Sequence, residues 1–263
     1  MRLRIAAAGL ALLLAAPAWA GVEEGRAALR AGDAAAALRE FGDAARGGDA
    51  EAEYLFATML KDGVGLGTPD LPAARAWYER AAAAGHAAAQ LDLGYMLFHG
   101  EGAAADREAG MFWYGKAAAQ GLAAAQYNMA KVLWDGDGAK RDPARAVGLF
   151  HEAAEQGLAE AQFALGVALL ASPKPDEAGA FAWFSRAAGQ GMAAAYGKLA
   201  GLYTLGRGTA KDPVAAATWA VLAEGAGDPV AKQLRLKLEN DLTPEQKAAA
   251  MAKARAFAPR LEK

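Results

Sequence analysis

The sequence predicts an all-α protein, an α-solenoid built from repeated antiparallel helix pairs. One unit occurs five times in register, at 49–85, 86–121, 122–157, 158–191 and 192–227. A fixed period of this length is typical of solenoids. Each copy also holds two stretches of apolar residues with helical spacing, separated by a turn that usually contains two glycines. These observations predict two helices per unit.

The first helix of each unit is predicted to be buried on most sides. In the second copy it should run from about Ala87 to Phe98. With about 100° per residue, its apolar side chains cover most of the circumference. Only a narrow stripe that includes Asp92, Tyr95 and His99 remains for solvent. We therefore expect each first helix to pack between others.

The second helix of each unit is predicted to start at an aspartate seven residues before the tryptophan position. These aspartates are Asp70, Asp106, Asp142, Asp176 and Asp212. Such a side chain accepts hydrogen bonds from free backbone N–H groups of the first helical turn. Farther along the helix, aromatic pairs such as Trp77-Tyr78 are expected to pack a ring against a small residue, for example Ala57, of a first helix.

The recurring pattern A-x-x-x-L-G, G-x-G and D-x-x-x-A-x-x-W-Y-x-x-A-A-x-x-G resembles the Sel-1-like repeat family, a relative of the tetratricopeptide repeat. The resemblance covers residues 49–227 and is closest to exported bacterial members. It implies a right-handed superhelix whose first helices line the inner curve. Two copies depart from the pattern. Residues 172–175 replace the glycine turn of the fourth copy, which is two residues shorter, and Leu149 stands at the third tryptophan position.

Residues 1–20 are predicted to be a secretory signal peptide that is cleaved after Ala20. Arg2 and Arg4 precede an apolar stretch, and Ala18-Trp19-Ala20 forms a small-x-small cleavage site. An uncleaved anchor is the alternative. Cleavage predicts a periplasmic or secreted protein with no further membrane attachment, and the absence of cysteine excludes lipid attachment through a cysteine.

The charge balance argues against nucleic acid as a partner. Removal of residues 1–20 leaves 26 basic and 30 acidic residues, a net charge of −4. A nucleic-acid or anionic-membrane surface needs an excess of Lys and Arg. The mature chain is expected to bind neither.

The two ends of the repeat array are predicted to be capped. Residues 21–48 form a degenerate N-terminal helix pair, and residues 228–263 form C-terminal capping helices. In the latter, Thr243, Pro244 and Gln246 predict a helix start with a capping box.

Signals for catalysis or metal binding are weak. His151 begins a sequence like a zinc-protease motif, but Glu155 stands where the second histidine is required. Asp135 and Asp137 alternate with glycines that recur as turns in the other copies, so a turn is favoured over a calcium site. No S-x-x-K motif of penicillin-recognising enzymes occurs. We therefore predict no catalytic residue, no cofactor and no metal.

Three recurring glutamines, Gln90, Gln126 and Gln162, fall within the packed arc of the first helices. A buried amide without a partner costs about 1–3 kcal/mol. We expect each amide to donate a hydrogen bond to a backbone carbonyl of a neighbouring turn. The alternative is that the three glutamines form a row that contacts a bound peptide.

The solvent stripe of the first helices is the predicted binding surface. Its candidate partner-binding residues are Asp92, Tyr95, His99, Asn128, Lys131 and Asp135. The stripe becomes small and apolar in the later copies. The resulting hypothesis is a non-enzymatic adaptor that binds a protein, a peptide or a cell-wall glycan such as peptidoglycan. The alternative is a cell-wall or β-lactam hydrolase, by analogy with cysteine-rich relatives.

Overall fold

The computed structural model describes residues 18–257, and every regular element in that range is a helix. The all-α prediction is confirmed. The helices are α1 (Ala18–Arg30), α2 (Ala34–Arg46), α3 (Ala50–Asp62), α4 (Leu71–Ala83), α5 (Ala87–His99), α6 (Arg107–Ala119), α7 (Ala123–Asp135), α8 (Pro143–Glu155), α9 (Ala159–Ala171), α10 (Glu177–Gly189), α11 (Ala193–Leu205), α12 (Pro213–Gly225), α13 (Ala231–Asn240) and α14 (Pro244–Ala256).

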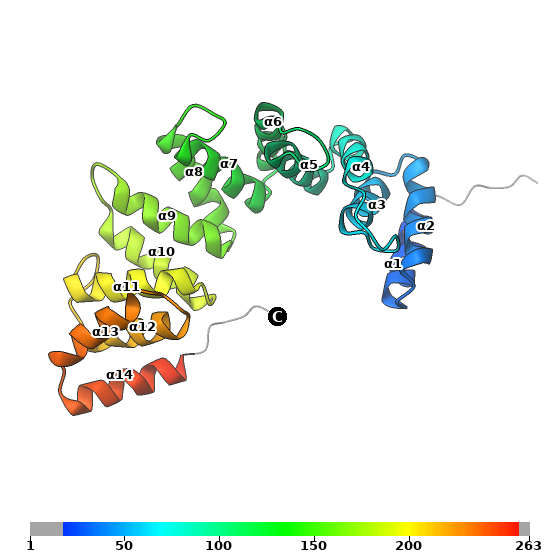
Figure 1. Cartoon of the computed structure of the whole chain (residues 1–263). Helices are drawn as coiled ribbons and strands as arrows, with labels where there is room; N and C mark the ends of the chain where they lie inside the picture. Colours follow the sequence, from blue (N-terminus) through cyan, green and yellow to red (C-terminus); the bar gives the residue numbers. More distant parts are fainter. Residues whose placement is uncertain (1–17, 258–263) are drawn as a thin grey trace, which may run out of the picture. The chain divides into compact units, whose positions relative to one another are not determined.

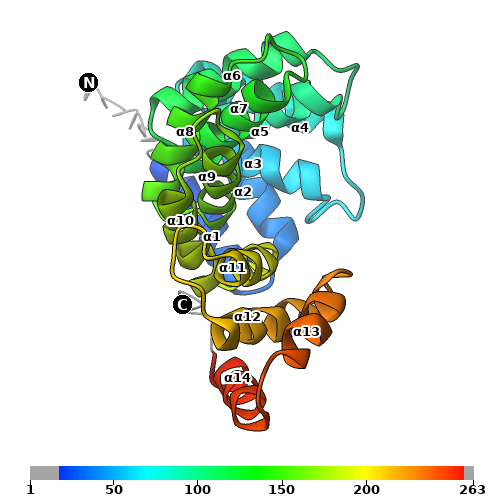
Figure 2. The ribbon, with the colours of Figure 1, turned by 90° about the vertical axis from the view of Figure 1, so that its left-hand side faces the viewer.

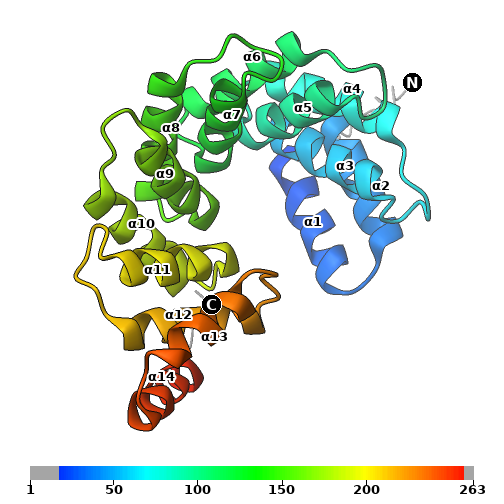
Figure 3. The same ribbon diagram turned by 60° about the vertical axis from the view of Figure 1, so that its left-hand side comes forward.

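The helices form two compact units, divided within α6 between Trp113 and Tyr114. In the first unit, α1 packs on α2 and α3 on α4 as antiparallel pairs (Figures 1 and 3). In the second unit the pairs are α7 with α8, α9 with α10 and α11 with α12. Helices α13 and α14 both pack on α12 at the C-terminal end (Figure 2). The predicted helix pairs are therefore present in both units.

The predicted aspartates begin the second helices. Asp70 accepts a hydrogen bond from Ala73 N at 3.1 Å, and Asp176 accepts one from Gly179 N at 2.8 Å. The same bond occurs at Asp106, Asp142 and Asp212. At the start of α14, Thr243 and Gln246 form the predicted capping box. These bonds satisfy backbone N–H groups that the helix itself leaves without partners.

Glycines in the left-handed conformation end most of the first helices. Gly63, Gly100, Gly136 and Gly206 follow α3, α5, α7 and α11 with φ between 70° and 77°. A side chain is disfavoured at such φ values, which explains the recurring glycine. Helix α9 differs, because it ends at Ser172 in an extended conformation.

The ring that fills the core is the one after the tryptophan position. Tyr78 and Phe184 are fully buried, whereas Trp77 is half-buried. Phe184 packs so closely on Gly166 that a Cβ there would lie 2.7 Å from its ring. The pairing of a ring with a small residue of the first helix is thus confirmed there, with the second aromatic residue of the pair supplying the ring.

The three recurring glutamines are buried, as expected, but they do not all have the same partner. Gln90 and Gln162 donate to the carbonyls of Ala82 and Ala154 at 3.0 and 3.1 Å. Gln126 instead donates to Glu152 Oε2 at 2.7 Å, so the expected backbone partner is wrong for this residue. Position 152 carries a carboxylate, whereas the matching position of the copies on either side is basic and cannot accept.

The N-terminal prediction falls largely outside the described residues, which begin at Ala18 within the predicted signal peptide 1–20. Helix α1 spans the predicted cleavage site after Ala20. From residue 18 to residue 257, the chain has no helix with the length and apolar character needed to span a membrane.

Candidate functional site

In the first unit, Asp92 belongs to a polar cluster on the exposed faces of α3 and α5. Its carboxylate lies 3.7 Å from Lys61 Nζ. Close by, the hydroxyl groups of Thr58 and Tyr78 are 3.0 Å apart. The rings of Tyr54 and Tyr78 lie 5.8 Å apart. The sequence identified Asp92 as a surface residue, and in the structure it is paired with Lys61 of α3.

The ionisation of this cluster is governed by burial. Burial raises the pKa of Asp92 above its usual value, and Lys61 offsets part of that rise. The pKa values of Tyr54 and Tyr78 are also raised, chiefly by burial. Loss of hydration disfavours the charged form of each group. The fold therefore disfavours the ionised form of Asp92, and the cluster faces solvent on one side only.

Tyr95 and His99 are exposed on the same stripe of α5, as predicted. Their rings lie 4.3 Å apart, and Tyr95 is 42% exposed. Two adjoining rings at the surface offer apolar area and polar edges together, which is a common feature of protein contact sites.

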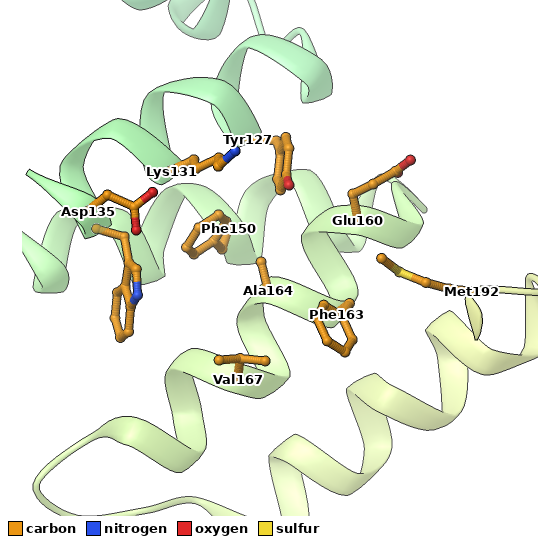
Figure 4. Close-up of a pocket in the computed structure, with 10 residues that line it drawn as sticks. Tyr127, Lys131, Asp135, Phe150, Glu160, Phe163, Ala164, Val167 and Met192 are labelled. Atoms are coloured by element: carbon orange, nitrogen blue, oxygen red, sulfur yellow. The ribbon is translucent and has the colours of Figure 1, made fainter. Parts of the chain in front are cut away.

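In the second unit, Lys131 and Asp135 line a pocket of about 210 Å³ on α7 and α9 (Figure 4). Its lining residues are Tyr127, Lys131, Trp134, Asp135, Phe150, Glu160, Phe163, Ala164, Val167 and Met192. Asn128, the third candidate on α7, is half-buried and lies outside this lining. The structure thus brings two of the six candidate residues together in one pocket.

Small side chains on α9 create this pocket. Ala164 and Val167 occupy the positions that Asp92 and Tyr95 hold on α5. The shorter side chains leave space between α7 and α9, with Phe150 of α8 beneath (Figure 4). The repeat that lacks large stripe residues is therefore the repeat that forms a concave apolar surface.

Charged groups surround the aromatic lining. Glu160 lies in the first turn of α9, Asp135 ends α7, and Lys131 lies between them in the lining of the pocket. Burial, with smaller effects from the charges of Glu160 and Asp135, raises the pKa of Tyr127. Tyr127 therefore stays protonated at neutral pH and keeps a hydroxyl donor near the two carboxylates.

Sequence reasoning missed the aromatic residues of the pocket. Tyr127 and Phe163 occupy matching positions of α7 and α9, at the edge of the arc predicted to be buried, and both are half-buried. Trp134, Phe150 and Met192 were also missed. Which of these side chains line the pocket depends on the space that α9 leaves uncovered, and no local sequence pattern indicates this.

Among residues 18–257, no three His, Asp or Glu side chains come together in a way that could hold a metal ion.

The family follows from the repeats themselves. A family model for the Sel1 repeat matches residues 50–86, 87–122, 123–158, 159–192 and 193–228. The chain belongs to the Sel1 repeat family. Sel1 repeats typically form scaffolds for protein–protein interactions and are generally non-catalytic. The comparison with curated proteins found no match.

Solved structures of Sel1 repeat proteins share the fold. A Sel1 repeat protein from Oxalobacter formigenes is 24% identical with a TM-score of 0.74, over 89% of this chain and 96% of that protein. A protective antigen of uropathogenic Escherichia coli that displays the same fold is 27% identical with a TM-score of 0.61. That match covers 90% of this chain and 60% of the antigen, so the chain spans less than two thirds of its length.

Proposed function

We propose that this Sel1 repeat protein is a non-catalytic adaptor that holds a segment of a partner protein on the exposed faces of its first helices. The observation that carries the proposal is the pocket between α7 and α9. It combines aromatic side chains with Lys131, Asp135 and Glu160 at one surface. Aromatic residues with a charged rim are typical of protein contact sites.

The pocket suits a side chain of a partner rather than a free substrate. Its volume of about 210 Å³ is below the usual range for small-molecule sites, about 300–1,000 Å³. A partner segment could place one apolar side chain against Phe150 and Phe163 while its backbone or neighbouring residues meet the charged groups. Tyr95 and His99 of the first unit supply further exposed aromatic surface.

Site-specific photocrosslinking tests the location of the site. A benzophenone amino acid at position 131, in the lining of the pocket, should capture a partner in living cells. The same amino acid at the exposed position 182 of α10 serves as the control, because Ala182 lies outside the pocket. Equal capture from both positions would argue against the pocket as the binding site.

A pocket-filling variant tests the captured partner in purified form. Ala164→Leu adds three carbons to the pocket floor, whereas Ala182→Leu adds the same group at an exposed site. We expect Ala164→Leu to weaken binding by about tenfold or more, as for a side chain displaced from a central contact. Equal melting temperatures of the two variants would show that the loss is not caused by unfolding.

We also infer export, with the periplasm or the extracellular space as the site of action. The basic and apolar residues of 1–20 support this inference. Cleavage after Ala20 would keep Val22, which is buried, and Gly25, which packs on Phe41. Intact-mass measurement of the protein from a native cell fraction is the test. A chain that begins at Met1 and stays in the cytoplasm would refute export.

Hydrolysis of a β-lactam or of peptidoglycan is the alternative activity. An adaptor without a catalytic group should show no turnover of nitrocefin or of purified peptidoglycan. Sustained turnover that scales with protein concentration would overturn the adaptor proposal, whatever the partner-binding results are.

A further inference from the structure

The turn between α9 and α10 differs from the other turns within the repeats. The segment between α7 and Asp142 has six residues with two glycines, whereas the segment between α9 and Asp176 is Ser172-Pro173-Lys174-Pro175. Both glycines are absent from the shorter turn.

In the longer turns, the second glycine lies over the first residues of a second helix, the one that belongs to the preceding repeat. A Cβ on Gly65 would lie 2.7 Å from the carbonyl oxygen of Ala34, the first residue of α2. A Cβ on Gly102 would lie 2.8 Å from the carbonyl of Leu71, the first residue of α4. Gly208 meets the first residues of α10 in the same way. These turns therefore cover the start of the second helix in the preceding repeat.

Over α8 that cover is missing, and a cavity of about 570 Å³ takes its place. Pro143, Ala144 and Val147 of α8 form one wall, at positions matching Ala34 and Leu38 of α2, the residues nearest Gly65. The rest of the lining is Trp134, Arg141, Ala168, Ala171, Ser172 and Pro173. The shortened turn accounts for the opening, because it removes the residues that cover this place elsewhere.

The cavity is apolar with one positive group at its edge. Arg141 Nε donates to the carbonyl of Trp134 at 2.9 Å, and the guanidinium lies 5.8 Å from the Trp134 ring. In the part of the chain that the structure describes, its remaining N–H groups have no protein acceptor. A guanidinium held in place by one bond retains donors for a carboxylate.

Neighbouring charges favour an anion as well. Lys140 and Lys174 are exposed on the two turns that flank the cavity. Of the acids on or next to these turns, Asp137 is exposed, whereas Asp142 and Asp176 accept bonds from the N–H groups of Arg145 and Gly179 at the starts of α8 and α10. The cavity therefore has an apolar interior and a positive rim.

We propose that this cavity binds the C-terminal residue of a partner protein, a Leu or Phe whose side chain enters the cavity while its carboxylate meets Arg141. At about 570 Å³ the cavity lies within the range of small-molecule sites, so it has room for a large apolar side chain and its terminal carboxylate together. The proposal rests on the adaptor function proposed above. It adds a second contact, because Trp134 lines both this cavity and the pocket between α7 and α9.

Fluorescence anisotropy with the full chain and three labelled peptides tests the proposal. The peptides are Gly-Ser-Gly-Ser-Gly-Phe with a free carboxylate, the same peptide as its C-terminal amide, and the free acid ending in Ser. The free-acid Phe peptide should bind about tenfold more tightly than either of the others, because each lacks one of the two contacts.

Two variants and one matched control place the binding at the cavity. Replacing residues 172–175 by the sequence of 206–211 restores a glycine turn over α8 and should abolish binding. Arg141→Gln should weaken the free acid about tenfold and leave the amide unchanged. Lys211→Gln removes the basic residue at the matching position beside α11 and should change nothing. If the turn replacement fails to fold, Arg141→Gln still decides the result.

Several outcomes overturn the proposal. These are no binding of the free-acid Phe peptide, equal binding of acid and amide, or binding that survives both variants. Displacement of the peptide by octanoate at equal concentration would indicate a site for small carboxylic acids. A dimer in light scattering that the turn replacement dissociates would indicate a second copy as the occupant.

The two proposals fail separately. Loss of peptide binding in Ala164→Leu, without effect of Arg141→Gln, would leave the pocket between α7 and α9 as the site and refute the cavity. Arg141-dependent binding of the peptide without capture from position 131 would refute the pocket and support the cavity.

Discussion

At the scale of single residues, glycines within helices of this chain have different roles that their identity alone does not reveal. Gly166 of α9 gives space to the ring of Phe184, whereas Gly148 of α8 is exposed, and a Cβ at that position would meet no neighbouring atom within 4 Å. The first glycine is required by packing. The second lowers helix stability through backbone entropy without a packing benefit.

This difference predicts opposite effects of the same substitution. Gly166→Ala should destabilise the fold by about 1–3 kcal/mol, because the methyl group displaces Phe184. Gly148→Ala should stabilise it by about 0.5–1 kcal/mol through helix propensity. Thermal and urea unfolding, followed by circular dichroism, measure both changes. Destabilisation of similar size in both variants would contradict the packing role of Gly166.

Asp92 predicts a pH dependence of stability. Its folded-state pKa is raised above the usual 3.8 by burial, so the folded chain holds this proton more tightly than the unfolded chain. The contribution of Asp92 to the free energy of unfolding therefore falls as pH rises through and above 3.8. The melting temperature of Asp92→Asn should rise relative to that of the wild type between about pH 3 and pH 7.

The control for this measurement is Glu24→Gln, since Glu24 is exposed on α1. Its melting temperature relative to the wild type should show no comparable trend. A constant difference between wild type and Asp92→Asn over the whole pH range would show that Asp92 keeps its ordinary pKa in the folded chain.

At the scale of helices, the second helices have more regular starts than the first helices. Each second helix from α4 to α12 has an aspartate whose carboxylate accepts from the first turn. By contrast, α7, α9 and α11 start after Leu122, Leu158 and Met192 without a side-chain cap. Those first helices depend more on packing, because no capping bond satisfies their first N–H groups.

Removal of one aspartate cap should therefore have a measurable cost. We expect Asp70→Ala to lower stability by about 1 kcal/mol, since Ala73 N loses its acceptor. Asp62→Ala, at the C-terminal end of α3, removes a charge that the helix dipole disfavours and should change stability by less than about 0.5 kcal/mol. Equal effects of the two substitutions on the urea midpoint would contradict the capping role.

At the scale of the whole molecule, the helix contacts run mainly between successive helices. In the second unit, α8 packs on α7 and α9, and α10 packs on α9 and α11. In repeat proteins, stability is approximately the sum of terms for single repeats and for their nearest neighbours. A local defect is therefore expected to have a local effect.

Hydrogen exchange measures this locality. Gly166→Ala should speed amide exchange in α8 to α11 and leave α2 to α4 of the first unit unchanged. Peptide-level mass spectrometry resolves these segments. An equal increase over the whole chain would indicate that both units unfold as one cooperative body.

The local features of this protein were determined by its sequence alone. The repeat period, the starts of the second helices, the aspartate caps and the family could be predicted from the sequence, because helix periodicity and capping act over a few residues. The Asp92–Lys61 pair, the partner of Gln126 and the choice of Tyr78 over Trp77 for the core were decided by tertiary packing.

Both cavities were likewise decided by tertiary structure. The pocket between α7 and α9 depends on Ala164 and Val167 standing opposite Tyr127 and beside Phe150, residues that three helices bring together. The cavity over α8 depends on the shortened turn at 172–175, which lies about 30 residues later in the chain and lacks both glycines. Each cavity is space that several separate segments leave unfilled, so no single stretch of sequence specifies it.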